Sequence, residues 1–167
     1  MIVVINVHYR ENEAKIVCLE IDNWTDNVSS KTHIVYKYDV AEYESGAFYK
    51  RELPCITNIM EFVDLEMVEC IVVDSYVYLD DNDKKGLGYY VYDHFEGKIP
   101  VIGVAKTSFH NNTKNVRPIL RGSSLSPLYV SSIGIELDLA AKYVLSIAGK
   151  FRQIVLMPCV INQFWIL

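Results

Sequence analysis

Two short apolar runs, each followed by a charged residue, constrain the fold of this chain most strongly. The first is Cys70–Val73, which is followed by Asp74, and the second is Ile99–Ala105, which is followed by Lys106. Unbroken apolar runs of this length are typical of strands that are buried on both faces of a layered sheet. We therefore expect two neighbouring strands that present an acid and a base at one sheet edge, where open α/β sheets place their chemistry.

The N-terminal third of the chain has a different pattern. Alternating apolar and polar residues, with short polar turns between them, predict an antiparallel meander of three strands. These strands cover Ile2–His8, Ala14–Ile21 and Thr32–Tyr38. Helical spacing of apolar residues then predicts a helix from about Lys50 to Met67, with Pro54 in its first turn.

The second half of the chain alternates helices and strands. Helices are expected at Gly86–Phe95 and Asp138–Ala148, and a hairpin is expected from Arg117–Leu120 and Leu128–Ser131. Three antiparallel strands followed by alternating helix and strand is the order of the ribonuclease H-like fold, an α/β fold with a mixed sheet and helices on both faces. We expect a single domain over residues 1–167, whose apolar tail, residues 151–167, docks as a helix.

Composition excludes several classes of protein. The net charge of −5 argues against a broad basic face that coats nucleic acid, although it allows a local grip on DNA or RNA. No apolar run is long enough to span a bilayer, and Met1–Val4 lacks the basic start of a signal peptide. The four cysteines lack CxxC spacing and lie mostly in apolar runs, which indicates buried free thiols in a cytoplasmic protein.

Three positions converge in a ribonuclease H-like fold, and in this chain they hold Asn6, Glu52 and Asp74. Carboxylates at such positions hold Mg²⁺ or Mn²⁺, which activates water for phosphodiester hydrolysis. The Asn6 amide oxygen can also bind a metal, but it carries no charge. We expect Lys106 to face a phosphate, because the small residues Gly103 and Ala105 would let a ligand approach closely.

Each of these residues also has a simpler interpretation. Asn6 could be an ordinary hydrogen-bonded polar group, Glu52 could favour the helix dipole, and Asp74 could cap the next turn. Lys106 could be a solvated strand end. Two loops have similar alternatives. Asp80–Asp83 resembles the start of a Ca²⁺ loop but is better interpreted as a solvated acidic loop. Arg121–Ser124 is either a plain hairpin turn or a phosphate cradle.

Several segments together resemble the endonuclease V family, which cleaves DNA or RNA near deoxyinosine or inosine with Mg²⁺. Residues 5–9, I-N-V-H-Y, resemble its first-strand segment V-D-V-S-Y/F, and residues 43–54, Y-E-S-G-A-F-Y-K-R-E-L-P, resemble Y-I-P-G-L-L-A-F-R-E-G-P. Residues 72–74 resemble its V-x-D strand end, and residues 99–106, I-P-V-I-G-V-A-K, are similar to I-P-T-I-G-V-A-K. The late hairpin also resembles the family's hairpin, so the resemblance covers nearly the whole chain.

The resemblance implies a role for each site residue. Asp74, Glu52 and Asn6 would hold the metal, Lys106 would contact the scissile phosphate, and Tyr43 would touch the displaced base. Ser75 and Gly103 would lie near the nucleic acid.

The chain departs from the family at three site positions. Asn6 stands where the family has its first-strand Asp, and Ser75 stands where it has the Gly after the second Asp. Ile135 stands where the family has a His that supports the metal. Two other functions therefore stay open. One is a catalytically inactive relative that binds nucleic acid or protein, and the other is phosphate chemistry on a nucleotide or another altered base.

Overall fold

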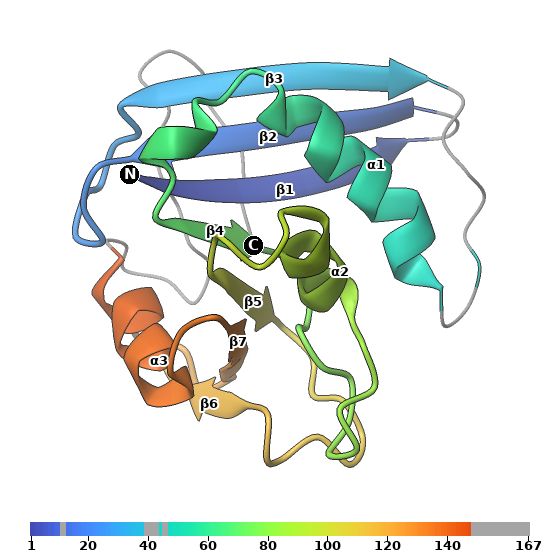
Figure 1. The fold of residues 1–167 in the computed structure, drawn as a ribbon. Coiled ribbons are helices and arrows are strands. Elements are labelled where there is room, and N and C mark those ends of the chain that lie inside the picture. Colours follow the sequence, from blue (N-terminus) through green and yellow to red (C-terminus); the bar gives the residue numbers. More distant parts are fainter. Residues whose placement is uncertain (11–12, 39–43, 45–46, 148–167) are drawn as a thin grey trace.

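The structure is a computed structural model, and it describes residues 1–10, 13–38, 44 and 47–147. Its centre is a seven-stranded sheet with the strand order β3-β2-β1-β4-β5-β7-β6 (Figure 1). The strands are β1 (Ile2–Arg10), β2 (Glu13–Ile21), β3 (Lys31–Tyr38), β4 (Cys70–Val73), β5 (Val101–Ala105), β6 (Arg117–Ile119) and β7 (Leu128–Ile133). The helices are α1 (Phe48–Met60), α2 (Leu87–His94) and α3 (Leu137–Ser146), with a short 3₁₀ turn, η1 (Leu65–Met67).

The pairing of the strands confirms the expected mixed sheet. β1, β2 and β3 form the antiparallel meander, whereas β4 pairs in parallel with both β1 and β5. The two apolar runs are therefore neighbours that point the same way, and their charged ends meet at one edge. β7 returns antiparallel to β5, and the short β6 closes that side of the sheet.

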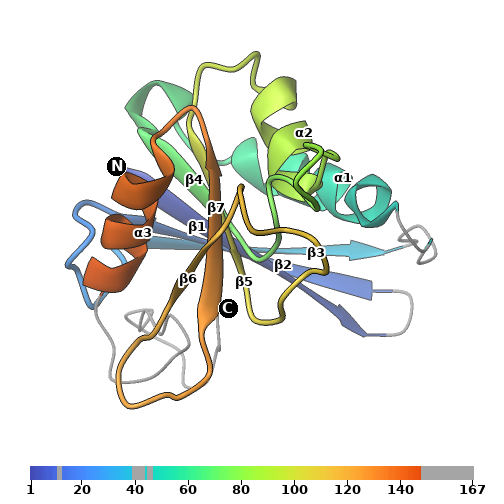
Figure 2. The same ribbon diagram turned by 90° about the horizontal axis from the view of Figure 1, so that it is seen from below.

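Helices cover both faces of this sheet, as Figure 2 shows in the view along its layers. α1 and α2 pack on one face against a core that includes Ile5, Ile16, Ile71 and Val101. α3 packs on the other face, against a second core whose members alternate with those of the first along the same strands. Because β4 and β5 are buried on both faces, their sequences read as continuous apolar runs.

The first helix is shorter than its apolar spacing predicted. α1 ends at Met60, and Asp64 accepts a hydrogen bond from the backbone N–H of Glu66 to start the separate turn η1. Met67, which the spacing placed on the buried side of one long helix, is 60 % exposed. Pro54 lies inside α1 rather than in its first turn. The capping side chain of Asp64 explains the break, because it offers the backbone a local alternative to helix.

The loop that begins at Arg121 has a structural role. The Arg121 side chain is buried, and its guanidinium donates a hydrogen bond to the backbone carbonyl of Ile147 at the end of α3. A cation at this position also complements the negative end of the helix dipole. The hairpin-turn interpretation is therefore the better one, because the arginine that a phosphate cradle would use points into the protein.

Three other expectations concern the chain as a whole. Cys18, Cys55 and Cys70 are buried free thiols, as their apolar surroundings predicted. Among the described residues, no helix is long and apolar enough to cross a membrane. Tyr43, Cys159 and the tail of residues 151–167 lie outside the described residues, so the expectations for them stay predictions.

Candidate functional site

Helix α1 brings Glu52 to the edge where β4 ends. The residues that α1 buries are Glu52, Cys55, Ile56, Ile59 and Met60. This spacing is the apolar stripe of an amphipathic helix, and Glu52 occupies its first position. A carboxylate at a stripe position must face the sheet. Glu52 is accordingly only 6 % exposed, which makes it an expensive residue to bury unless it has a task.

Asp74 and Lys106 form the acid and base pair that their strands predicted. The Lys106 ammonium nitrogen lies 4.0 Å from Oδ2 of Asp74, and the two side chains are 40 % and 33 % exposed. At this distance and exposure the pair contributes little to stability. Burial raises the pKa of Asp74, and the charge of Lys106 opposes that rise. Both groups are open enough to meet a ligand.

Glu52 and Asp74 lie close enough to repel each other. Burial, and then the charge of Asp74, raise the pKa of Glu52 to about 8. A hydrogen bond with Tyr9 and the positive charge of Arg51 oppose this rise. Two carboxyl groups that repel each other when both are ionised are a common feature of sites that bind a cation or share a proton.

Asn6 belongs to this edge through strand register. β1 and β4 pair as far as Ile5 with Val73, and the next position places Asn6 beside Asp74. Both residues follow the alternation of the α3 face, whereas Glu52 approaches from the α1 face. β4 ends at Val73, whereas its neighbours β1 and β5 continue to Arg10 and Ala105, so Asp74 leaves the strand at the level of Asn6. Asn6 itself is half-buried.

The segment around Ser75 explains why Gly103 is a glycine. A Cβ on Gly103 would lie 2.4 Å from the Ser75 carbonyl oxygen and 2.7 Å from Oγ of Ser131. That hydroxyl accepts a hydrogen bond from the backbone N–H of Val77 at 2.9 Å and ties the segment to β7. The reason we gave for Gly103, close approach by a ligand, is therefore wrong, because the protein's own backbone fills the space. Ser75 is half-buried beside Asp74.

Two further residues lie at the site without having been predicted from the sequence, Tyr9 and Arg51. The Arg51 guanidinium lies 3.7 Å from the centre of the Tyr9 ring, and the Tyr9 hydroxyl is 4.0 Å from Sγ of Cys55. Nε of Arg51 is buried and has no hydrogen-bond partner within the described part of the chain. Strand alternation could have found Tyr9, since it lies three residues after Asn6 and must face the opposite side, toward α1.

The acidic loop of Asp80–Asp83 is ordered by its own hydrogen bonds. Asp81 accepts from the backbone N–H groups of Thr113 and Lys114 at 2.7 and 2.6 Å. Asp83 lies 3.3 Å from the Lys114 ammonium nitrogen. These carboxylates are exposed and bond the neighbouring loop, so the solvated-loop interpretation needs one addition: the loop also holds residues 111–115 in place.

The donor set at the sheet edge fits one hard divalent cation. Mg²⁺ is commonly bound by one or two carboxylates with water completing its octahedron, and Glu52 and Asp74 supply that number. Their mutual repulsion is what a cation would relieve. Asn6 adds a neutral oxygen. No group of three or more His, Cys, Asp or Glu residues suited to a metal occurs in the described ranges, and the candidate site itself brings together only two carboxylates.

The strand order and helix placement define the ribonuclease H-like α/β fold, and several solved structures that are similar to this chain are structures of endonuclease V. The enzyme of Ciona intestinalis, in complex with a 24mer DNA containing an inosine followed by a ribo-adenosine, matches with a TM-score of 0.70 and 13 % identity over 87 % of this chain and 76 % of that one. The catalytic domain of human endonuclease V matches with a TM-score of 0.64 and 19 % identity, covering 90 % and 75 %. Endonuclease V of Bacillus subtilis matches with a TM-score of 0.64 and 19 % identity, covering 90 % and 72 %.

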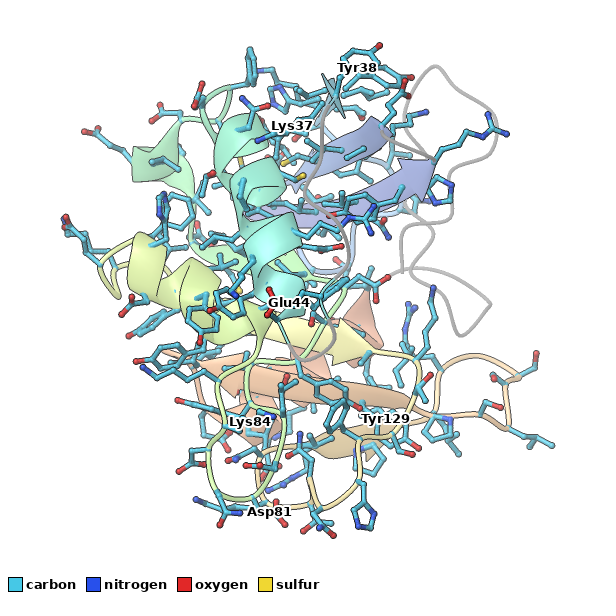
Figure 3. All side chains as sticks on the ribbon, turned by 90° about the vertical axis from the view of Figure 1, so that its right-hand side faces the viewer. Lys37, Tyr38, Glu44, Asp81, Lys84 and Tyr129 are labelled. Carbon is cyan, nitrogen blue, oxygen red and sulfur yellow. The ribbon has the colours of Figure 1, made fainter. Side chains whose placement is uncertain are left out.

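No family model and no curated protein matches the sequence. The structural matches alone, at 13 % and 19 % sequence identity, show that the chain has an endonuclease V-like fold. Figure 3 looks onto the edge that carries the site. Lys37 and Tyr38 lie at one end of this view, at the end of β3, and Lys84 and Tyr129 lie beyond the start of α1 at the other.

Proposed function

We propose that this protein is an endonuclease V-like nuclease that hydrolyses phosphodiester bonds in inosine- or deoxyinosine-containing nucleic acid with Mg²⁺ or Mn²⁺. The observation that carries the proposal is the opposed pair of Glu52 and Asp74 at the open edge of an endonuclease V-like sheet. A buried glutamate that faces a second carboxylate is costly without a cation.

Each residue at the edge has a proposed part. Glu52 and Asp74 hold the metal, and Asn6 supplies a neutral third oxygen. When bound, the metal supplies a water of lowered pKa and stabilises charge on the leaving oxygen. The Lys106 ammonium, 4.0 Å from Asp74, binds a phosphate oxygen of the scissile bond. Ser75 contacts the nucleotide, while Gly103 acts indirectly by letting the Ser75 segment pack closely. Tyr43, which lies outside the described residues, contacts the displaced base.

A second candidate function is a catalytically inactive relative that binds nucleic acid or a protein partner. Two observations favour it. Asn6 brings no charge to the metal, and the Glu52 carboxyl, with a pKa of about 8, holds its proton near neutral pH when no cation is bound. Ile135, where the resemblance implies histidine, packs against the core on the α3 face.

A cleavage assay separates these functions. The substrates are DNA with one deoxyinosine, RNA with one inosine, and DNA with an inosine followed by a ribo-adenosine, each with Mg²⁺ or Mn²⁺ and with an inosine-free control. If the proposal holds, the wild-type protein cleaves near the inosine, and Asp74→Asn and Glu52→Gln each lower the rate at least about 100-fold because a metal ligand is lost. Asn6→Asp raises the rate.

The matched control is Asp93→Asn, which changes an exposed acid on α2 and leaves the rate unchanged. Cleavage that appears only in Asn6→Asp supports the inactive relative, provided that the wild-type protein still binds the oligonucleotides. Wild-type cleavage that survives Asp74→Asn would contradict the proposed site.

A further inference from the structure

Four tyrosines from α1, α2 and the segment before α2 form a continuous row of rings, the tyrosine row (Tyr49, Tyr90, Tyr89 and Tyr78). The rings of Tyr49 and Tyr90 are stacked with their centres 3.7 Å apart. Tyr89 lies edge-on to Tyr90 at 5.9 Å, and Tyr78 lies 5.9 Å from Tyr89 on the other side. All four residues are half-buried, so each keeps part of its surface in contact with solvent.

Close packing at the start of α2 holds the row together. A Cβ on Gly88 would lie 2.8 Å from Cγ2 of Val77 and 3.2 Å from its Cα, so the glycine lets α2 approach the segment that carries Tyr78. The Tyr78 carbonyl also accepts a hydrogen bond from Nδ2 of Asn112 at 2.7 Å. The rings are therefore in place before any ligand arrives, which lowers the entropic cost of binding.

Both ends of the tyrosine row belong to the segments that carry the two carboxylates of the candidate site. Tyr49 lies three residues, or about one helical turn, before Glu52 on α1. Tyr78 lies four residues after Asp74, in the segment whose Val77 N–H is bound by β7. A strand of nucleic acid at the carboxylates can therefore extend onto the row.

Cations accompany the row, although the chain as a whole is acidic. Two Lys or Arg residues are adjacent at only two places in the sequence, Lys50–Arg51 and Lys84–Lys85, and both places adjoin the row. The ammonium nitrogen of Lys85 lies 4.2 Å from the centre of the Tyr89 ring. The row thus combines aromatic surface with local positive charge.

The acids next to these lysines already have partners. Asp83 lies 3.3 Å from the ammonium nitrogen of Lys114 and accepts a hydrogen bond from Nδ2 of Asn115 at 2.7 Å. Its charge is therefore balanced by the 111–115 loop. Glu44 pairs with Lys50 at 2.9 Å, but both side chains are exposed, and such a pair is weak enough for a phosphate to replace the carboxylate.

We propose that the tyrosine row binds single-stranded nucleic acid that extends from the candidate site, with bases on its rings and phosphates on Lys84 and Lys85. Aromatic rings beside cations bind single strands with little regard to sequence, because every base has a face that can stack. A tyrosine ring can stack while its hydroxyl stays in water. The inference rests on the proposed function in one respect, that the ligand is a nucleic acid, and it requires no metal, inosine or cleavage.

Fluorescence anisotropy in EDTA tests the proposal with two probes. One is single-stranded oligothymidylate, and the other is an abasic oligonucleotide of the same length, which keeps the phosphates and lacks the bases. Tyr89→Leu removes a flat ring but keeps an apolar side chain. It should weaken oligothymidylate binding about 5-fold or more and leave binding of the abasic strand unchanged. Tyr89→Phe, which keeps the ring, should bind both probes like the wild type.

The matched control is Tyr36→Leu. Tyr36 also has a lysine beside its ring, with the Lys15 ammonium nitrogen 5.8 Å from the ring centre, but it lies on the edge strand β3. Its replacement should leave both affinities unchanged. Tyr78→Leu repeats the test at the end of the row, and it decides the matter if thermal unfolding shows that Tyr89→Leu is not folded.

Three results would overturn the proposal. The first is wild-type affinity for oligothymidylate in the folded leucine variants of the row, and the second is an equal loss of affinity for the abasic strand. The third is a wild-type protein that binds neither probe, which would favour a protein partner at this surface. Binding of oligothymidylate without cleavage of inosine substrates contradicts the proposed function alone and leaves the tyrosine row as a binding surface.

Discussion

At the scale of single residues, Glu52 is the unusual feature of this chain. It occupies the first position of the buried stripe of α1, where an apolar residue would pack at no electrostatic cost. Burial and the charge of Asp74 raise its pKa to about 8. The ordinary value of 4.5 applies to the unfolded chain, so the folded protein holds a proton that the unfolded protein has already released between these pH values.

This difference predicts that the metal-free protein loses stability as the pH rises from 4.5 to about 8. The whole pKa difference corresponds to a loss on the order of 5 kcal/mol in the free energy of unfolding, of which about 3 kcal/mol falls between pH 5.5 and 8.5. The loss is absent below the lower pH and complete above the higher one. Urea unfolding in EDTA at pH 5.5 and 8.5 measures it, and Glu52→Gln should flatten the dependence. Asp93→Asn serves as the control that keeps it, and equal slopes in the wild-type protein and Glu52→Gln would disprove the assignment.

At the scale of elements, the site depends on how the segment after β4 packs on β5. Gly103 lets the Ser75 carbonyl lie against the strand, and the Ser131 hydroxyl on β7 holds the Val77 N–H. These contacts place Asp74 at the end of β4 with its neighbours in fixed positions. The identity of residue 103 therefore affects how the segment that follows Asp74 is held beside the candidate site.

Gly103→Ala should therefore destabilise the protein by about 2 kcal/mol, because the added methyl group overlaps backbone that cannot move away freely. Urea unfolding measures the change. Ser131→Ala should cost about 1 to 2 kcal/mol, since it leaves a buried N–H without its acceptor. Ser123→Ala, in an exposed loop, is the neutral control. A Gly103→Ala protein as stable as wild type would show that the Ser75 segment is free to shift.

Local patterns predicted most elements and some of the site. The meander and the buried strands followed from alternation and apolar runs, because burial on one face or on two leaves different sequence periods. The end of α1 did not follow, since the Asp64 cap breaks a helix whose apolar spacing continues. The expectation that Gly103 lets a ligand approach was also wrong. Ser75 and Ser131 fill the space beside Gly103, and Ser131 is 28 positions away in the chain.

At the scale of the whole molecule, the net charge of −5 limits how the protein would bind the nucleic acid of its proposed function. A chain with this charge repels a polyanion at long range, so attraction must come from a few cations near the site. Lys106 lies beside Asp74, Arg51 precedes Glu52 on α1, and Lys37 lies near Cys55 of the same helix. A small number of phosphate contacts gives binding with a shallow dependence on salt.

Fluorescence anisotropy with inosine-containing single-stranded DNA should therefore give a slope of log affinity against log salt of about −2, which corresponds to two or three phosphate contacts. Lys106→Gln should reduce the steepness of the slope by about 1. Lys98→Gln is the matched control, because Lys98 precedes β5 at the opposite edge and is paired with Glu96. A slope steeper than about −6 would indicate a broad basic surface and contradict this view.

The sequence by itself determined the order of elements, the mixed sheet and the meeting of Asp74 and Lys106 at one edge. The sequence determined them because a strand that is buried on both faces, as in a parallel sheet, is a continuous apolar run that can be recognised locally. Only the tertiary structure decided that Glu52 lies close enough to Asp74 to change its pKa, that Arg51 stacks on the Tyr9 ring beside it, and that Ser75 fills the space at Gly103. These relations join residues far apart in the chain, and their strength depends on distances and burial that no local pattern specifies.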